Sequence, residues 1–150
     1  MRLERISAPA QFDELFSLAE QNRLERSHYA APFYVYYHRL RQIQANQNYA
    51  WFLFYAESGP VGYCVLYADP ERIHNAITVY DIYMRENHRR QGAFRLLFET
   101  LYEMSRRHGY EKIRWDSDLP PEVWEHICKV RPKVQYLYTI DAQDWRNANA

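Results

Sequence analysis

The sequence predicts one domain of the α/β class, with a mixed, mostly antiparallel twisted sheet and helices on both of its faces. The first observation is a pair of apolar and aromatic runs, residues 49–55 and 61–67, which Ser58, Gly59 and Pro60 separate. Two strand-like runs joined by a short Gly/Pro turn are typical of an antiparallel hairpin. The second observation is the length of 150 residues, which suits a single domain with a sizeable core.

The third observation is a strand, a helix and a strand in succession. Residues 76–84 have the pattern of a strand, residues 92–107 that of a long amphipathic helix ended by His108 and Gly109, and residues 110–115 that of the next strand. This order predicts a crossover connection that leaves the two strands parallel. The apolar stripe of the helix comprises Phe94, Leu97, Phe98, Leu101 and Met104.

The N-terminal part is predicted to form a short strand and two helices. Residues 2–6 fit a strand, and a helix begins near Pro9 and extends to about Arg26. In this helix Phe12, Leu15, Phe16 and Ala19 recur at helical spacing. Residues 27–47 contain the second helix, one side of which is rich in aromatic residues.

The C-terminal part is predicted to form a helix, a single strand and a loose end. We expect Asp118 to cap a helix whose first positions are Pro120 and Pro121. Apolar residues alternate from 134 to 140, which predicts a half-buried strand. Residues 143–150 have little apolar surface to bury, and we expect them to be frayed.

Composition and charge restrict the function. Nineteen basic and nineteen acidic side chains cancel, so net charge gives no reason to expect binding to nucleic acid or to an anionic membrane. No apolar run reaches the ~20 residues that span a bilayer. Cys64 and Cys128 are far apart and the six histidines lack an HxxxH or HExxH pattern, so neither a disulfide framework nor a metal site is expected. Without a signal peptide, we expect a cytoplasmic location.

The most informative stretch is the basic turn between residues 84 and 92. It contains Arg85, Arg89 and Arg90, and its only glycine, Gly92, stands where the long helix begins. A helix start leaves about four backbone N–H groups without partners and has a partial positive charge, so it favours an anion such as a diphosphate. A solvated basic loop is the alternative, since one glycine is weaker evidence than a multi-glycine fingerprint.

Residues 89–94, Arg-Arg-Gln-Gly-Ala-Phe, resemble the signature of the GNAT N-acetyltransferase superfamily, which is Gln or Arg, two free positions, Gly, a free position, and Gly or Ala. Phe94 departs from it, because a small residue is usual at the last position. The end of the preceding strand at 81–84 and the turn at 57–63 are also similar to the family. The resemblance covers about residues 50 to 116.

The resemblance implies acetyl-CoA as the acetyl donor, an amine as acceptor and direct attack in a ternary complex. Backbone groups of residues 82–84 would pair with the pantetheine arm, and residues 89–95 would hold the diphosphate. The implied cofactor residues are Ile82, Tyr83, Met84, Arg89, Arg90, Gln91, Gly92, Ala93, Phe94 and Arg95. The implied acceptor wall comprises Tyr29, Phe33, Tyr34, Tyr36 and Tyr37, for which packing on the sheet is the alternative.

Asp81 is the candidate general base, because it lies in a strand otherwise made of apolar and aromatic residues, where partial desolvation suits a carboxylate to proton transfer. A structural carboxylate is the alternative, and Glu86 is a second candidate. The tyrosine that the family often uses as general acid is absent from the helix after the fifth strand. Candidate replacements are His126, Cys128, Tyr136 and Tyr138.

Three other interpretations remain open. The protein could retain the fold and bind acetyl-CoA or a protein partner without catalysis. It could be a basic module that binds single-stranded nucleic acid through its arginines and tyrosines. The single strand predicted after the last helix, where the family usually has two, also indicates a sheet edge available to a partner or to a second copy in a homodimer.

Overall fold

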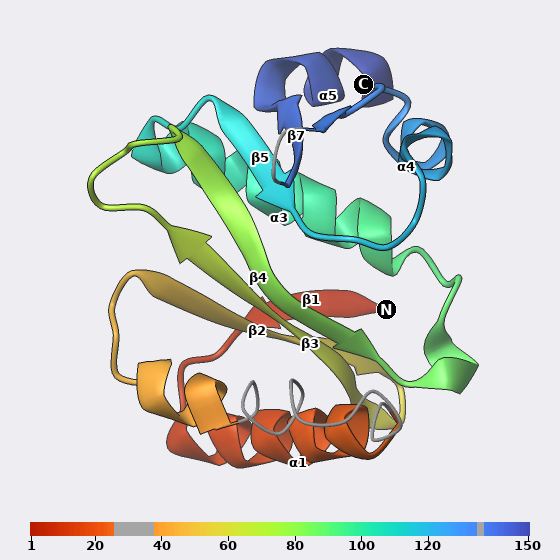
Figure 1. The fold of residues 1–150 in the computed structure, drawn as a ribbon. Coiled ribbons are helices and arrows are strands. Elements are labelled where there is room, and N and C mark those ends of the chain that lie inside the picture. Colours follow the sequence, from red (N-terminus) through yellow and green to blue (C-terminus); the bar gives the residue numbers. More distant parts are fainter. Residues whose placement is uncertain (26–37, 135–136) are drawn as a thin grey trace. The chain divides into compact units, whose positions relative to one another are not determined.

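The computed structural model describes residues 1–25, 38–134 and 137–150. The chain divides into two compact units, one made of residues 1–65 and 81–91 and the other of residues 66–80 and 92–150. Strands β3 (Gly59–Ala68) and β4 (Ala76–Met84) contribute to both units. We describe each unit by itself, with the elements labelled as in Figure 1.

The first unit begins with β1 (Arg2–Arg5), which pairs antiparallel with β2 (Tyr49–Ala56). A short turn joins β2 to β3, as the hairpin pattern predicted, and the two strands are neighbours in the sheet. The backbone N–H of Arg85, just after β4, donates to the carbonyl of Val61 at 2.9 Å. The central residues of β2 and β3 are buried, which explains why both runs are continuously apolar.

Helix α1 (Pro9–Glu25) lies along the strands of the first unit (Figure 1) and confirms the predicted first helix. Phe16 packs on Trp51 of β2 with ring centroids 6.2 Å apart. The Gln11 side chain accepts hydrogen bonds from the backbone N–H groups of Ser7 and Ala8, at 2.8 and 3.0 Å. Helical backbone is also found at residues 38–43, inside the predicted second helix, whereas its aromatic residues at 29–37 lie outside the described part of the chain.

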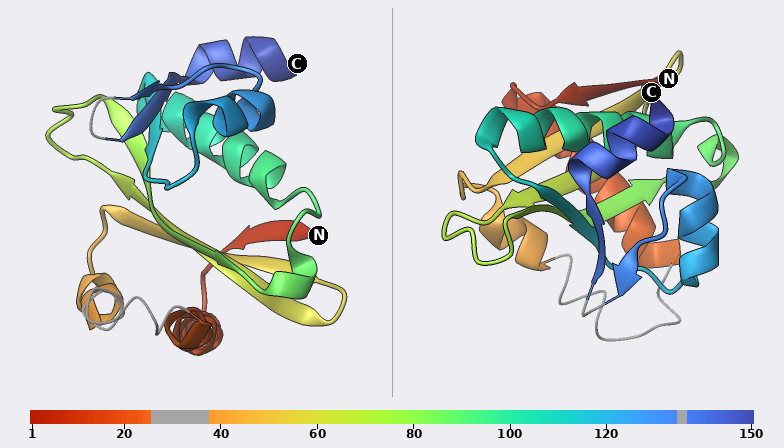
Figure 2. Two further views of the ribbon diagram at one scale, coloured as in Figure 1. Left: turned by 45° about the vertical axis from the view of Figure 1, so that its right-hand side comes forward. Right: turned by 90° about the horizontal axis from the view of Figure 1, so that it is seen from above.

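The second unit contains the predicted crossover. The first half of β4 pairs parallel with β5 (Lys112–Trp115), in a register that places Ile77 opposite Ile113. The connection between them includes helix α3 (Ala93–His108). Gly109 ends this helix in the left-handed conformation, with φ 72°. Figure 2 shows α3 beside β5, and Phe98 of α3 meets Trp115 of β5 edge to face at 5.4 Å.

The C-terminal prediction was partly wrong. Two strands follow the last predicted helix instead of one: β6 (Lys133–Val134) and β7 (Tyr138–Asp141), which pair antiparallel with Val134 opposite Tyr138. The alternating pattern spans both strands, so it concealed the reversal of the chain between them. The homodimer hypothesis rested on a missing strand, and β6 removes that argument.

Residues 143–150 do not form a frayed tail. They belong to helix α5 (Ala142–Asn149), whose first turn is capped by the Asp141 side chain, which accepts from the backbone N–H of Asp144 at 3.0 Å. Trp145 is 2% exposed and stacks on Phe98 at 6.0 Å. Trp145 and Ala142 thus give this otherwise polar segment a buried side.

The predicted cap of the preceding helix was also wrong. Helix α4 (Pro121–Cys128) has Pro120 at its N-cap position, without a side-chain cap. Pro121 stands at the first helical position, where its missing N–H costs nothing. In the second unit, the sheet order β4-β5-β7-β6 and the helices α3, α4 and α5 complete the predicted mixed α/β fold.

Candidate functional site

Asp81 lies in the part of β4 that belongs to the first unit, and it is half-buried. The Tyr63 hydroxyl of β3 donates to Oδ2 of Asp81 at 2.7 Å. Tyr63 in turn accepts a hydrogen bond from the side-chain amide of Asn22 in α1, at 3.2 Å. Two neighbouring elements thus hold the carboxylate that the sequence singled out.

The backbone after Asp81 is fixed by polar contacts inside the same unit. The Tyr83 hydroxyl donates to Glu25 of α1 at 2.6 Å. Burial and, to a smaller extent, the Glu25 carboxylate raise the pKa of Tyr83 to about 12, so this hydroxyl stays protonated at neutral pH. Arg85 donates through Nε to the Gln21 side chain at 2.9 Å. The end of β4 is therefore tied to the C-terminal turns of α1.

Arg89 has partners other than the diphosphate that the resemblance implied. Its Nε donates to the carbonyl oxygen of Met84 at 2.8 Å, and its terminal nitrogen forms an ion pair with Glu25 at 2.9 Å. Both ends of this ion pair are exposed, so its net contribution to stability is small. We assign Arg89 to holding the turn that follows β4.

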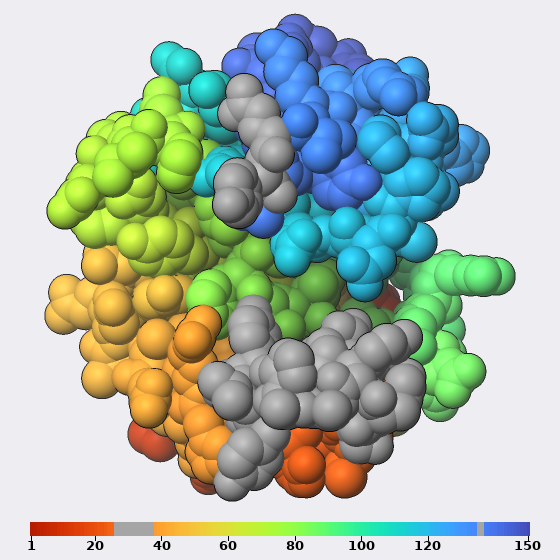
Figure 3. Space-filling model, in the orientation of Figure 1, coloured from red at the N-terminus to blue at the C-terminus, as the bar shows by residue number. Residues whose placement is uncertain are grey.

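The turn contains two left-handed residues close together. A short 3₁₀ helix (Glu86–His88) leads into it, Arg90 has φ 65°, and Gly92 has φ 85° and ψ 11°. A left-handed residue other than glycine is uncommon, so Arg90 marks a constrained turn. Residues 89–92 are exposed, and the light green segment at the right of the space-filling view stands at the surface (Figure 3).

Helix α3 opens without a side-chain cap in the second unit. Gly92 is its N-cap residue, and the Gly92 carbonyl accepts from the backbone N–H of Leu96 at 3.3 Å. An added Cβ on Gly92 would meet no atom within 4 Å, so the backbone at the helix start is open to approach. Phe94 is 38% exposed, which corrects its predicted place in the apolar stripe, and its ring meets Trp124 edge to face at 5.2 Å. The geometry at this helix start suits an anion.

Gly62 of β3 explains how closely β3 and β4 approach in the first unit. A Cβ built on Gly62 would lie 2.5 Å from the carbonyl oxygen of Tyr83 and 3.0 Å from the Met84 side chain. Only glycine permits this approach.

We predict that Gly62→Ala lowers the free energy of unfolding by about 1–3 kcal/mol, because the extra methyl group displaces the β4 backbone. Urea-induced unfolding measures this change. A Gly62→Ala protein as stable as the wild type would contradict the close approach.

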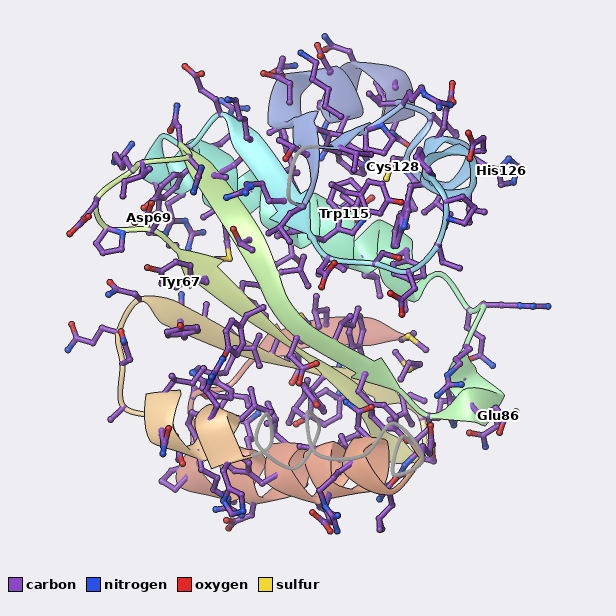
Figure 4. All side chains as sticks on the ribbon, in the orientation of Figure 1. Tyr67, Asp69, Glu86, Trp115, His126 and Cys128 are labelled. Atoms are coloured by element: carbon purple, nitrogen blue, oxygen red, sulfur yellow. The ribbon has the colours of Figure 1, made fainter. Side chains whose placement is uncertain are left out.

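The candidate general acids lie in positions that suit proton transfer less well than the position of Asp81. Cys128 is fully buried in the second unit (Figure 4), and burial raises its pKa to about 12. The Tyr138 hydroxyl donates to the carbonyl of Leu119, and its ring stacks on Trp115. His126 is exposed on α4, and Tyr136 lies outside the described residues. The observed contacts of Cys128 and Tyr138 are those of packing residues.

Sequence analysis missed Asn22 and Tyr63, although one signal was available. Asn22 continues the spacing of Leu15, Leu18 and Ala19 on the buried side of α1, and a polar residue at an apolar position indicates a buried polar contact. Tyr63 gave no such signal, because it stands within an unbroken apolar run.

Residues 1–25, 38–134 and 137–150 contain no group of three or more His, Cys, Asp or Glu side chains arranged to hold a metal ion. The helices in those ranges include none with the length and apolar character needed to cross a bilayer.

The fold and the uncapped helix start after β4 agree with the acetyltransferase class that the resemblance implied. The model of the Acetyltransferase (GNAT) family matches residues 12–122, and the chain belongs to this family. No curated protein matches the chain in sequence.

Solved structures support the same fold. An aminoglycoside 6'-N-acetyltransferase from Acinetobacter haemolyticus superposes with a TM-score of 0.61 and 14% identity, over 91% of this chain and 96% of that one. A spermidine N-acetyltransferase chimera from Vibrio cholerae and hSSAT gives a TM-score of 0.64 and 14% identity, over 98% and 99%. A GNAT acetyltransferase from Staphylococcus aureus gives 0.63 and 9%, over 93% and 99%.

Proposed function

We propose that the protein transfers an acetyl group from acetyl-CoA to a primary amine, by direct attack within a ternary complex. Family membership supports acetyl-CoA as the donor. The observation that carries the proposal is the start of α3, where an exposed left-handed glycine leaves the first backbone amides open. These amides would bind the diphosphate of the donor, and the exposed Arg90 in the turn before the helix would add positive charge.

Asp81 would supply the acceptor chemistry. Amines of ordinary basicity are protonated at neutral pH, so one proton must leave before the nitrogen can attack a thioester. Asp81 is half-buried and accepts a hydrogen bond from Tyr63, and we assign to it the role of taking this proton from the amine. The backbone of residues 82–84 would hold the pantetheine arm. Direct attack is preferred because, in the described part of the chain, no side-chain nucleophile with an adjacent base is evident. Burial, and to a smaller extent the Asp81 charge, raises the pKa of the Cys64 thiol above its ordinary range.

The acceptor class is defined by a panel of amines. Two of the structural neighbours act on an aminoglycoside and on spermidine, so both compounds belong in the panel. A lysine side chain in a peptide and a peptide N-terminus represent the protein acceptors. Release of the CoA thiol with time measures transfer to each amine. Thiol release with any of the four supports the proposal, and binding of acetyl-CoA without release favours a catalytically silent relative.

We predict that Gly92→Ala weakens acetyl-CoA binding about tenfold or more. The substitution adds a methyl group at the exposed residue that opens the helix, and it forces a left-handed alanine, which costs about 1 kcal/mol or more. Calorimetric titration with acetyl-CoA, and with 3'-phosphoadenosine 5'-diphosphate as a probe that lacks the pantetheine arm, measures the loss. Both ligands should lose affinity equally.

Gly59→Ala is the matched control for backbone strain. Gly59 also has a positive φ, 118°, and open space at its Cβ position, but it is the first residue of β3, directly after the turn from β2. It should lose stability and keep its affinity for acetyl-CoA. If Gly92→Ala binds both ligands as the wild type does, the amides of α3 are not the diphosphate site.

A further inference from the structure

A chain of hydrogen bonds in the first unit leads from the interior to Asp81. Asn22 donates to the Tyr63 hydroxyl oxygen at 3.2 Å, and Tyr63 donates to Asp81 at 2.7 Å. Asn22 is 4% exposed and Tyr63 is fully buried, whereas Asp81 is half-buried. The proposed base is therefore held by two side chains that solvent and substrate do not reach.

The direction of these hydrogen bonds follows from the number of protons. A tyrosine hydroxyl has one hydrogen. Because the Asn22 amide donates to the hydroxyl oxygen, that hydrogen is directed at Asp81. A hydrogen bond to an ionised carboxylate is stronger than one between neutral groups, and it fixes the orientation of the acceptor.

Asn22 is costly for the fold. Its side-chain oxygen is buried and has no hydrogen-bond partner within the described ranges of the chain. A buried carbonyl without a partner destabilises the folded state, and most buried polar groups avoid this. An apolar residue would suit the stripe that contains Leu15, Leu18 and Ala19. The polar side chain at this position indicates a requirement other than stability.

We propose that Tyr63, oriented by Asn22, is a positioning residue that holds Asp81 for proton transfer. The inference rests on the proposed function. A proton moves from the acceptor's ammonium group to the Asp81 carboxylate, and the nitrogen lone pair then forms a bond to the thioester carbon. The carbon–sulfur bond breaks, the nitrogen gives up a second proton and the departing sulfur takes one up. The products are the acetamide and the CoA thiol, and Asp81 returns its proton to solvent. Tyr63 touches none of the reacting atoms.

The first test is Tyr63→Phe, assayed with acetyl-CoA and the amine of the panel that releases thiol fastest. We expect kcat to fall roughly 10- to 100-fold, because misplacement of a catalytic group reduces the rate steeply. The KM for the amine should stay unchanged, because Tyr63 does not contact it. Tyr55→Phe is the matched control: the Tyr55 hydroxyl of β2 donates to Glu14 of α1 at 3.5 Å, and its loss should leave kcat unchanged.

The second test separates positioning from structural support. In an Asp81→Asn protein, which lacks the base, adding Tyr63→Phe should change kcat less than twofold, because Tyr63 acts through Asp81. Asn22→Leu should lower kcat while leaving the melting temperature equal or higher, since it removes an unpaired buried oxygen. A structural role predicts the reverse, with a lower melting temperature and unchanged kcat.

The outcomes distinguish this inference from the proposed function. If Asp81→Asn is inactive and Tyr63→Phe keeps the wild-type kcat, the positioning role is wrong and the function stands. The positioning role is also wrong if Tyr63→Phe lowers kcat as strongly in the Asp81→Asn protein as in the wild type. Absence of thiol release from the wild-type protein with every amine overturns both.

Discussion

Asp81→Asn is expected to lower kcat/KM for amine acetylation by about 10²–10⁴-fold at neutral pH, the range that general bases contribute. Asparagine has the same shape and can still accept the hydrogen bond from Tyr63. What is lost is the ability to take a proton. Thiol release from acetyl-CoA measures the change, and calorimetry should find acetyl-CoA affinity equal to that of the wild type.

The pH dependence gives the same prediction a second readout. An amine with a pKa near that of lysine, ~10.4, is almost fully protonated at pH 7, about one-third free near pH 10 and largely free only above about pH 11. The difference in kcat/KM between the wild type and Asp81→Asn should therefore become smaller as pH rises, because the amine then loses its proton without a general base. A gap that stays constant over this range would indicate that Asp81 acts by another route.

Glu86→Gln is the matched control for Asp81. Glu86 is a carboxylate at the exposed 3₁₀ turn a few residues along the same chain segment (Figure 4). It was the second candidate base, and it lies exposed, whereas Asp81 is half-buried. Glu86→Gln should leave kcat/KM unchanged. A loss of kcat/KM equal to that of Asp81→Asn would indicate that Glu86 is the general base.

The sequence predicted the elements that carry a strong local signal. The hairpin of β2 and β3, β4 and α3 were recognised because continuous apolar runs, a glycine turn and a helical stripe are local patterns. The same reasoning located the turn after β4, since an arginine-rich segment with one glycine is visible without any tertiary contact.

The features that could not be predicted from the sequence depend on tertiary contacts. The resemblance gave Arg89 a place beside the diphosphate, but its contact with Glu25 could not be predicted, because Glu25 is 64 residues away in the sequence. Tyr63 was hidden in an apolar run because aromatic residues suit a strand on either face. Helix α5 was missed because its stability depends on a cap and a single buried ring rather than on an apolar stripe.

Trp145→Ala is expected to lower the free energy of unfolding by about 3–5 kcal/mol, the typical cost of removing a large buried aromatic side chain. The Trp145 ring is 2% exposed and packs on Phe98 and Tyr102 of α3 in the second unit. Without it, little else on α5 is apolar enough to dock the helix. Guanidinium-induced unfolding followed by circular dichroism measures the loss.

Trp145→Phe is the matched variant, because it keeps an aromatic ring in contact with Phe98. It should lose less than half as much stability as the alanine variant, since only part of the buried area is removed. Helix α5 also supports α4, because the Asn149 side chain donates to the carbonyl of Cys128 at 2.7 Å. Undocking α5 should therefore expose the Cys128 thiol, which the wild type buries completely, to a thiol reagent. If Trp145→Ala keeps both its stability and its protected thiol, α5 does not hold the C-terminal part of the second unit together.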